Sequence, residues 1–149
     1  MPPLTKAEVD SLLAELGPQV NTEADKIALG VQAYRKFLTA YPQYIALFSR
    51  LQGLDINNVF QSDGIKYYGR TFVDDIVKFV QAAADDAQFK KALEDNGKAH
   101  TTRNVTKDQF MSGEPIFIDF FKSALKKPEN QAAVEKLLKA IFPTVASYL

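Results

Sequence analysis

The amino-acid sequence predicts an all-α fold with about seven or eight helices in one domain, residues 1–149. Apolar residues recur every three or four positions along most of the chain, which is the period of a helix with one buried face. No alternation of apolar and polar residues is long enough to indicate a β-strand. Prolines and helix-capping residues divide the chain at intervals that match the lengths of helices.

Capping signals locate the first two helices. Thr5 and Glu8 form a capping box at the start of a helix that Gly17-Pro18 ends. A second helix begins after Asn21-Thr22, either of which can cap it, and Pro42 ends it. Its predicted apolar face consists of residues spaced three or four apart: Ile27, Val31, Tyr34, Leu38 and Tyr41.

Residues 44–51 are expected to form a turn and a corner, and residues 54–60 one or two helical turns. A long helix begins after Ser62 and reaches about residue 84, with two adjacent apolar stripes that predict packing on two sides. The next helix follows residues 85 and 86. Thr106 caps a helix that runs to about residue 126, and Pro115 either kinks this helix or marks its true start. The last helix begins near residue 128.

Composition excludes several classes of function. Eighteen basic and eighteen acidic residues cancel and form no basic cluster, so no nucleic-acid partner is expected. The chain has no cysteine, which excludes disulfides, thiolate catalysis and cysteine-ligated zinc or iron–sulfur sites. No apolar run approaches the roughly 18 residues of a membrane span. We therefore expect no membrane partner and a cytoplasmic location.

His100 is the single histidine of the chain and the candidate metal ligand. Phe89, Leu93 and Asn96 share its face of the helix, and a lone histidine there is more often a core residue hydrogen-bonded to a carbonyl. No Gly-rich phosphate loop, Ser-His-Asp motif or di-iron Glu-x-x-His pair accompanies it. A metal site with one histidine requires a ligand that fills the other coordination positions itself, as a porphyrin does.

Five residues together resemble the skeleton of the globin family: Tyr34, Pro42, Phe48, Tyr68 and His100. Gly30 and Gly69 match the small residues at which the second helix and the distal helix of globins cross. The chain is most similar to the haemoglobins of trematode flatworms, which have tyrosine at both ligand-facing positions. The segments that carry this likeness are residues 42–45 (PQYI), 48–51 (FSRL) and 111–117 (MSGEPIF).

The resemblance implies a globin fold around one pocket for haem b (iron protoporphyrin IX). It implies that His100 is the proximal iron ligand through Nε2, and we expect its Nδ1 to donate to a backbone carbonyl such as that of Asn96. Tyr34 and Tyr68 are then the distal donors to bound oxygen. The remaining expected pocket residues are Phe48 and Phe72 as walls, Val105, and Arg50 toward a propionate, with Arg103 and Lys66 as weaker candidates for that contact.

Helical phase distinguishes the two neighbouring tyrosines. Tyr68 is in phase with the apolar residues Ile65 and Phe72, whereas Tyr67 is in phase with polar residues. We therefore expect Tyr68 to face the ligand and Tyr67 to lie at the surface or at the haem edge.

The expected function is reversible binding of oxygen and other small haem ligands by a monomer that is not an enzyme. The implied affinity is high, because two tyrosine hydroxyls can donate to the ligand. The alternative is a haem enzyme that consumes nitric oxide or peroxide. A peroxidase requires a distal base that titrates near neutral pH, and the one histidine is already assigned to the iron. A helical interaction domain without haem is the third possibility.

Overall fold

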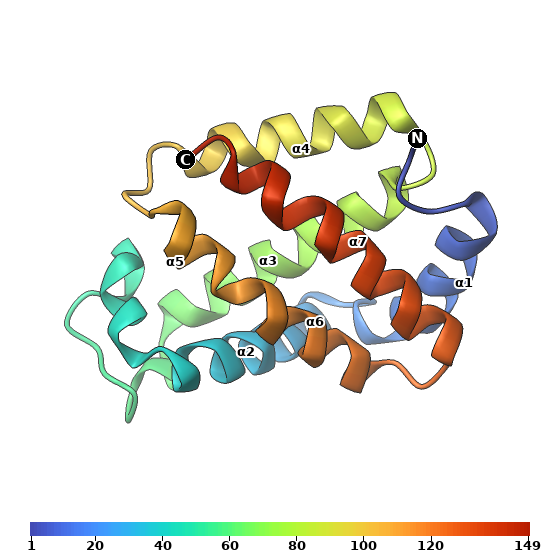
Figure 1. Cartoon of the computed structure of the whole chain (residues 1–149). Coiled ribbons are helices and arrows are strands. Elements are labelled where there is room, and N and C mark those ends of the chain that lie inside the picture. The colour runs from blue at the N-terminus through green and yellow to red at the C-terminus, as the bar shows by residue number, and fades with distance from the viewer.

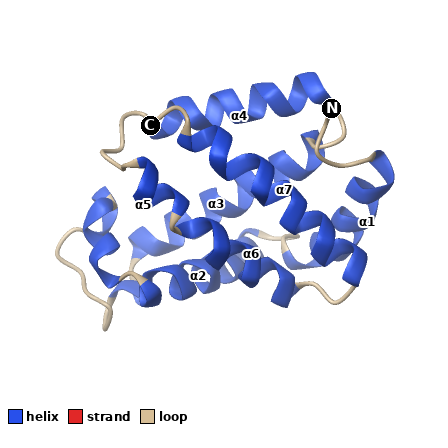
Figure 2. Ribbon diagram, viewed as in Figure 1, coloured by secondary structure: helices blue, strands red, loops and turns tan.

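The computed structural model describes all 149 residues and contains helices but no strand (Figures 1 and 2). The α-helices are α1 (Lys6–Leu16), α2 (Glu23–Ala40), α3 (Asp63–Ala82), α4 (Asp86–His100), α5 (Lys107–Met111), α6 (Gly113–Ala124) and α7 (Pro128–Ala146). Short 3₁₀ helices span Gly17–Gln19, Pro42–Leu47, Ser49–Leu51 and Val59–Gln61. The all-α class and the expected number of helices are confirmed. No helix is long and apolar enough to cross a membrane.

Side-chain caps set the helix starts that the sequence predicts. Capping boxes are present at the N-termini of α1, α2 and α5, and Thr22 rather than Asn21 caps α2. The α5–α6 segment breaks at Ser112, and Pro115 lies in the first turn of α6, where a missing backbone N–H breaks no helical hydrogen bond. The alternative in which Pro115 marks the true start of a helix is therefore the correct one.

Two local predictions differ from the structure. Of residues 54–60, only the last two enter a 3₁₀ turn, Val59–Gln61. On α2, the buried face includes Leu29, Ala33 and Phe37 as well as the predicted Leu38. The reason is that α2 contacts both α3 and α6, so that it needs two apolar stripes and the prediction identified one. Tyr34 lies on the half-buried border of these stripes.

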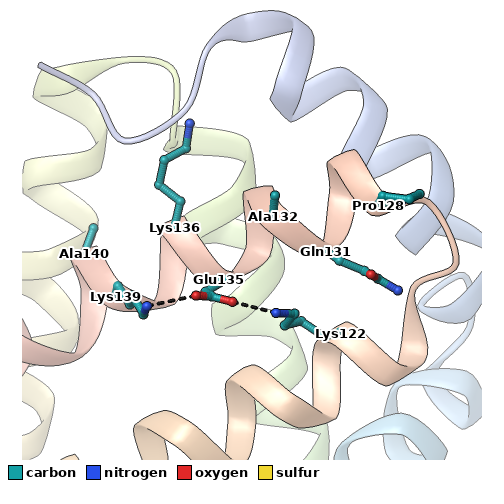
Figure 3. Close-up of a pocket in the computed structure, with 8 residues that line it drawn as sticks. All are labelled: Lys122, Pro128, Gln131, Ala132, Glu135, Lys136, Lys139 and Ala140. Atoms are coloured by element: carbon teal, nitrogen blue, oxygen red, sulfur yellow. Dashed lines mark hydrogen bonds and ion pairs between the residues drawn. The ribbon is translucent and has the colours of Figure 1, made fainter.

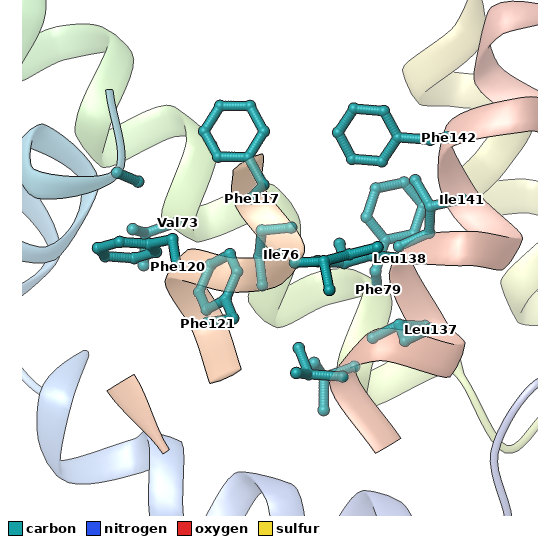
Figure 4. Close-up of a cluster of buried hydrophobic side chains, with 14 of the residues drawn as sticks. Val73, Ile76, Phe79, Phe117, Phe120, Phe121, Leu137, Leu138, Ile141 and Phe142 are labelled. Atoms are coloured by element: carbon teal, nitrogen blue, oxygen red, sulfur yellow. The ribbon is translucent and has the colours of Figure 1, made fainter. Parts of the chain in front are cut away.

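The core lies between α3, α6 and α7, where side chains from the three helices interdigitate (Figure 4). Its labelled members are Val73, Ile76, Phe79, Phe117, Phe120, Phe121, Leu137, Leu138, Ile141 and Phe142. Around this core, α4 runs along one side and ends beside the last residues of the chain, whereas α2 closes the opposite side (Figure 1). The end of α4 holds His100, the middle of α2 holds Tyr34, and the first half of α3 holds Tyr68 and Phe72. The other predicted site residues lie between helices: Phe48 and Arg50 between α2 and α3, and Val105 between α4 and α5.

Gly30 on α2 and Gly69 on α3 allow these two helices to cross with their backbones in contact, as the sequence predicts. A Cβ atom added to Gly30 would lie 2.0 Å from the carbonyl oxygen of Gly69, and one added to Gly69 would lie 2.9 Å from the backbone nitrogen of Val31. Neither contact can be relieved by rotating a side chain, because the opposing atoms belong to the backbone. The crossing therefore depends on glycine at both positions.

Replacement of Gly30 by alanine should separate α2 from α3. We expect Gly30→Ala to lower the free energy of unfolding by about 1–3 kcal/mol, as overpacking typically does. This loss opposes the gain in helix propensity of up to about 1 kcal/mol from alanine. Gly17→Ala is the matched control, since a Cβ there would meet no atom within 4 Å. Urea denaturation measures both variants, and equal stabilities would contradict the close-contact account.

Candidate haem pocket

His100 is the last residue of α4, and a local hydrogen bond orients its ring. Nδ1 lies 2.8 Å from the backbone oxygen of Asn96, one turn earlier. A carbonyl oxygen can only accept, so Nδ1 carries the proton and Nε2 keeps its lone pair. The hydrogen bond that the sequence predicts is therefore present. The polar neighbour of Nε2 is Nη1 of Arg103, at 3.5 Å.

The surroundings of His100 favour the neutral ring. The ring is half-buried, and it packs edge-on against Phe110 at a centroid distance of 5.2 Å. Burial lowers the pKa of His100 below its ordinary value of 6.5, and the positive charge of Arg103 lowers this pKa further, whereas the hydrogen bond to Asn96 opposes both effects. The imidazole is thus neutral at pH 7, which is the form that binds a metal.

Tyr34 on α2 lies within a cluster of phenylalanines. Its ring is 5.6 Å from Phe48, 5.5 Å from Phe72 and 6.0 Å from Phe117, measured between ring centroids, and each contact is edge-to-face. Burial raises the pKa of Tyr34, and no hydrogen bond contributes to this shift. Because every fully buried side-chain polar atom has a partner, the unpaired hydroxyl must border accessible space. Tyr34 is therefore a protonated donor without a protein acceptor.

Tyr68 on α3 is close to the same cluster, but its hydroxyl has partners. Its ring packs against Phe48 at 5.0 Å, and its oxygen accepts a hydrogen bond of 3.1 Å from the backbone N–H of Arg50. The Ser49 hydroxyl lies 3.3 Å from the same oxygen. In this structure Tyr68 thus binds the corner after Phe48, whereas Tyr34 keeps its donor free.

The other predicted pocket residues divide into two groups. Phe48 and Phe72 meet around Tyr34, and Val105 is half-buried shortly after the end of α4. Arg50 is exposed, and its guanidinium stacks on the ring of Tyr67 at 3.7 Å. Tyr67 is 38% exposed and lies at the surface as expected. Lys66 is also exposed.

Sequence reasoning did not identify Phe110 and Phe117 as site residues. Phe110 on α5 contacts His100, and Phe117 on α6 contacts both Tyr34 and Phe72. Seven residues separate them, which indicates one helix face only in a continuous helix. Because the chain breaks at Ser112 between α5 and α6, the two rings reach the site from separate helices, and the sequence has no local signal for this.

These residues suit a haem better than a bare metal ion. No group of three or more histidine, cysteine, aspartate or glutamate side chains is placed to hold an ion. The site offers one imidazole nitrogen whose only polar contact is with Arg103 at 3.5 Å, one unpaired hydroxyl, and several aromatic side chains. A macrocycle that supplies four nitrogens needs only one protein ligand and apolar faces, so the residues present fit the group.

A surface hollow of about 630 Å³ lies elsewhere, between α6 and α7 (Figure 3). Glu135 lies in it and pairs with Lys122 at 2.7 Å and with Lys139 at 2.8 Å. These two ion pairs lower the pKa of Glu135 to about 2. One carboxylate thus pairs with two lysines, which leaves a net positive charge, and the hollow brings together no metal-ligand set or nucleophile. The candidate chemistry therefore lies at His100 and Tyr34 and not in this hollow.

The lowered pKa of His100 predicts how acid affects the haem-free protein. Below pH 6.5 the unfolded chain protonates His100 before the folded chain does, so unfolding is favoured as the pH falls through this window. His100→Gln removes the titrating group and should flatten the pH dependence of the free energy of unfolding just below pH 6.5. Urea denaturation at each pH measures the effect. Parallel curves for the wild type and His100→Gln would contradict the pKa shift.

Comparison with known proteins identifies the family. The globin family model matches residues 31–145. A globin of the trematode Isoparorchis hypselobagri is 46% identical over 98% of this chain and 99% of its own length. A globin of Dicrocoelium dendriticum is 49% identical over 96% of this chain and 94% of its own. Ferric myoglobin of Aplysia limacina has a similar fold, with a TM-score of 0.80 and 22% identity over 97% of this chain and 98% of that one. The chain therefore belongs to the globin family.

Proposed function

We propose that residues 1–149 form a single globin domain that holds haem b through His100 and binds oxygen and other small ligands reversibly. Membership of the globin family supports haem-based oxygen binding in general. The observation that carries the finer proposal is the state of two polar groups in this chain. Nε2 of His100 carries the lone pair and has only a long contact of 3.5 Å, from Nη1 of Arg103, and the Tyr34 hydroxyl has a proton without an acceptor.

In this proposal His100 would be the iron ligand. When bound, haem supplies the ferrous iron at which oxygen binds and from which it is released. The Asn96 carbonyl holds the proton of His100 on Nδ1, which directs Nε2 outward as the ligating atom and increases its electron donation. The lowered pKa of His100 keeps this nitrogen available below neutral pH.

Tyr34 is the stronger of the two candidate donors to the ligand. Its proton stays on the hydroxyl because burial raises its pKa, and donation requires it to break no existing hydrogen bond. The bond that Tyr68 accepts from Arg50 leaves its own proton available, but this bond and the Ser49 contact hold its oxygen at the corner after Phe48. A move of the hydroxyl toward the ligand would break contacts that contribute about 1 kcal/mol each. We therefore expect Tyr34 to contribute more than Tyr68 to retention of the ligand.

Phe48, Phe72 and Phe117 surround the ring of Tyr34 and make the surroundings of its hydroxyl largely apolar. A hydrogen bond to a partly negative ligand is stronger in such a low-dielectric environment than in water. The same apolar walls cover the hydrophobic faces of a porphyrin. The cluster thus supports both cofactor binding and ligand retention.

The proposed function is oxygen binding and not catalysis. Peroxide cleavage requires a group that takes up and returns a proton near pH 7. The raised pKa of Tyr34 makes it a poor base, and His100 is engaged with the iron. The alternative of nitric oxide consumption needs an electron donor in addition to bound oxygen. The cytoplasmic location and the monomeric state stay predictions from the sequence.

Removal of the histidine tests the cofactor assignment. We expect His100→Gly to lose most of the Soret absorption of the purified ferrous protein, because the iron loses its protein ligand. Added imidazole should restore the band if the vacated space accepts the free ligand. Far-ultraviolet circular dichroism checks that the helices remain. An unchanged Soret spectrum in His100→Gly would exclude His100 as the ligand.

Oxygen dissociation rates test the roles of the tyrosines. Loss of a hydrogen bond of about 1.5–3 kcal/mol predicts release about 10- to 100-fold faster in Tyr34→Phe. Tyr68→Phe should show a smaller increase, and Tyr67→Phe is the control because Tyr67 lies at the surface. Stopped-flow measurements give all three rates. Equal rates in Tyr34→Phe and the wild type would contradict the donor role.

A further inference from the structure

Asn96 connects His100 to a second helix. Its backbone oxygen lies 2.8 Å from Nδ1 of His100, and its side-chain amide nitrogen lies 3.4 Å from Oδ2 of Asp75 on α3. The residue thus has one polar contact with the ring and another with α3. Because 3.4 Å is long for a hydrogen bond, the contact with Asp75 is the more easily broken of the two.

Asp75 differs from its neighbour Asp74 in what it faces. Asp74 pairs with Lys26 at 2.9 Å and with Arg70 at 3.5 Å, on the side of α3 that meets α2. Asp75 is half-buried toward α4, and its only hydrogen bond is the one from Asn96. Burial raises the pKa of Asp75, and the positive charges of Lys78 and Arg103 partly oppose this effect. A carboxyl group in such a place is costly unless it has a partner.

The turn that holds His100 is the end of its helix and has few other restraints. After His100 the chain leaves the helix, and Asn104 takes a left-handed backbone conformation with φ of 46°. Helix ends fray where nothing holds them. Gly97 packs under the ring of Tyr148, and the ring of His100 packs on Phe110. Asn96 is the polar link from this turn to α3.

We propose that Asp75 is a positioning residue for the iron ligand. Asp75 holds the side-chain amide of Asn96, and this contact fixes the turn of α4 so that the Asn96 carbonyl keeps its hydrogen bond to His100. This inference rests on the proposed function, in which Nε2 of His100 binds haem iron. Groups that orient a metal-ligating histidine through its other nitrogen also adjust its basicity. Asp75 acts one step farther away, through Asn96.

Two substitutions remove the link from opposite sides. Asp75→Ala removes the acceptor, and Asn96→Leu removes the amide donor but leaves the backbone carbonyl in place. Asp74→Ala is the matched control, because it removes a carboxylate of the same helix that has no contact with Asn96. Asp75→Asn keeps an oxygen that can accept from the amide, so it should restore most of the wild-type behaviour.

The readout is the iron–histidine stretching vibration of the ferrous haem protein, measured by resonance Raman spectroscopy. Asp75→Ala and Asn96→Leu should each shift this band to lower frequency, because a less constrained carbonyl polarises the Nδ1 proton less. The double variant should show no further shift, since both substitutions break the same link. Haem transfer to an acceptor protein should be about three- to tenfold faster in the same variants, below the 10- to 100-fold typical of direct partners of a ligand.

The outcomes separate this inference from the proposed function. A wild-type protein without an iron–histidine band would contradict the role of His100 itself. A wild-type band that stays unshifted in both Asp75→Ala and Asn96→Leu would overturn the positioning role alone. An equal shift in Asp74→Ala would also overturn it, because the effect would then come from net charge. Urea denaturation of each variant shows whether a shift of the iron–histidine band merely reflects a general loss of folding.

Discussion

The contact between Gly30 and Gly69 fixes how α2 lies on α3, and the positions of the distal residues follow from it. Tyr34 lies one turn after Gly30 on α2, and Tyr68 and Phe72 flank Gly69 on α3. Backbones that touch leave no freedom for the helices to slide or to rotate about this point. The ring contact between Tyr34 and Phe72 is therefore a consequence of the crossing as much as of side-chain packing.

The polar groups of the candidate site differ in how fully they are hydrogen-bonded. Nδ1 of His100 bonds to a backbone oxygen, and the Tyr68 oxygen accepts from a backbone N–H. Nε2 of His100 has only a contact of 3.5 Å with Arg103, and the Tyr34 hydroxyl has no hydrogen bond. A protein interior normally satisfies its polar atoms. Weakly paired or unpaired groups beside aromatic side chains therefore bear on what could bind there, and in this chain they are one candidate metal ligand and one proton donor.

Much of the fold and part of the site could be predicted from the sequence, because the signals are local. Capping boxes and prolines define helix starts within a few residues, and the bond from His100 to Asn96 spans a single helical turn. Contacts between distant segments could not be predicted in this way. The partner of Tyr68 is the backbone N–H of Arg50, whose direction depends on a corner without a sequence signature. Asp75 and Asn96 are 21 residues apart and meet only because α3 and α4 pack together.

The contact between Gly97 and Tyr148 has a consequence for natural variation in this family. A Cβ at position 97 would lie 2.4 Å from the tyrosine ring, so any larger residue there requires a smaller or displaced partner at position 148. The two positions should therefore covary among related chains, whereas the exposed Lys91 and Lys98 of the same helix should vary independently. Gly97 lies within one helical turn of His100. A related chain with other residues at positions 97 and 148 would therefore also differ in how its histidine is positioned.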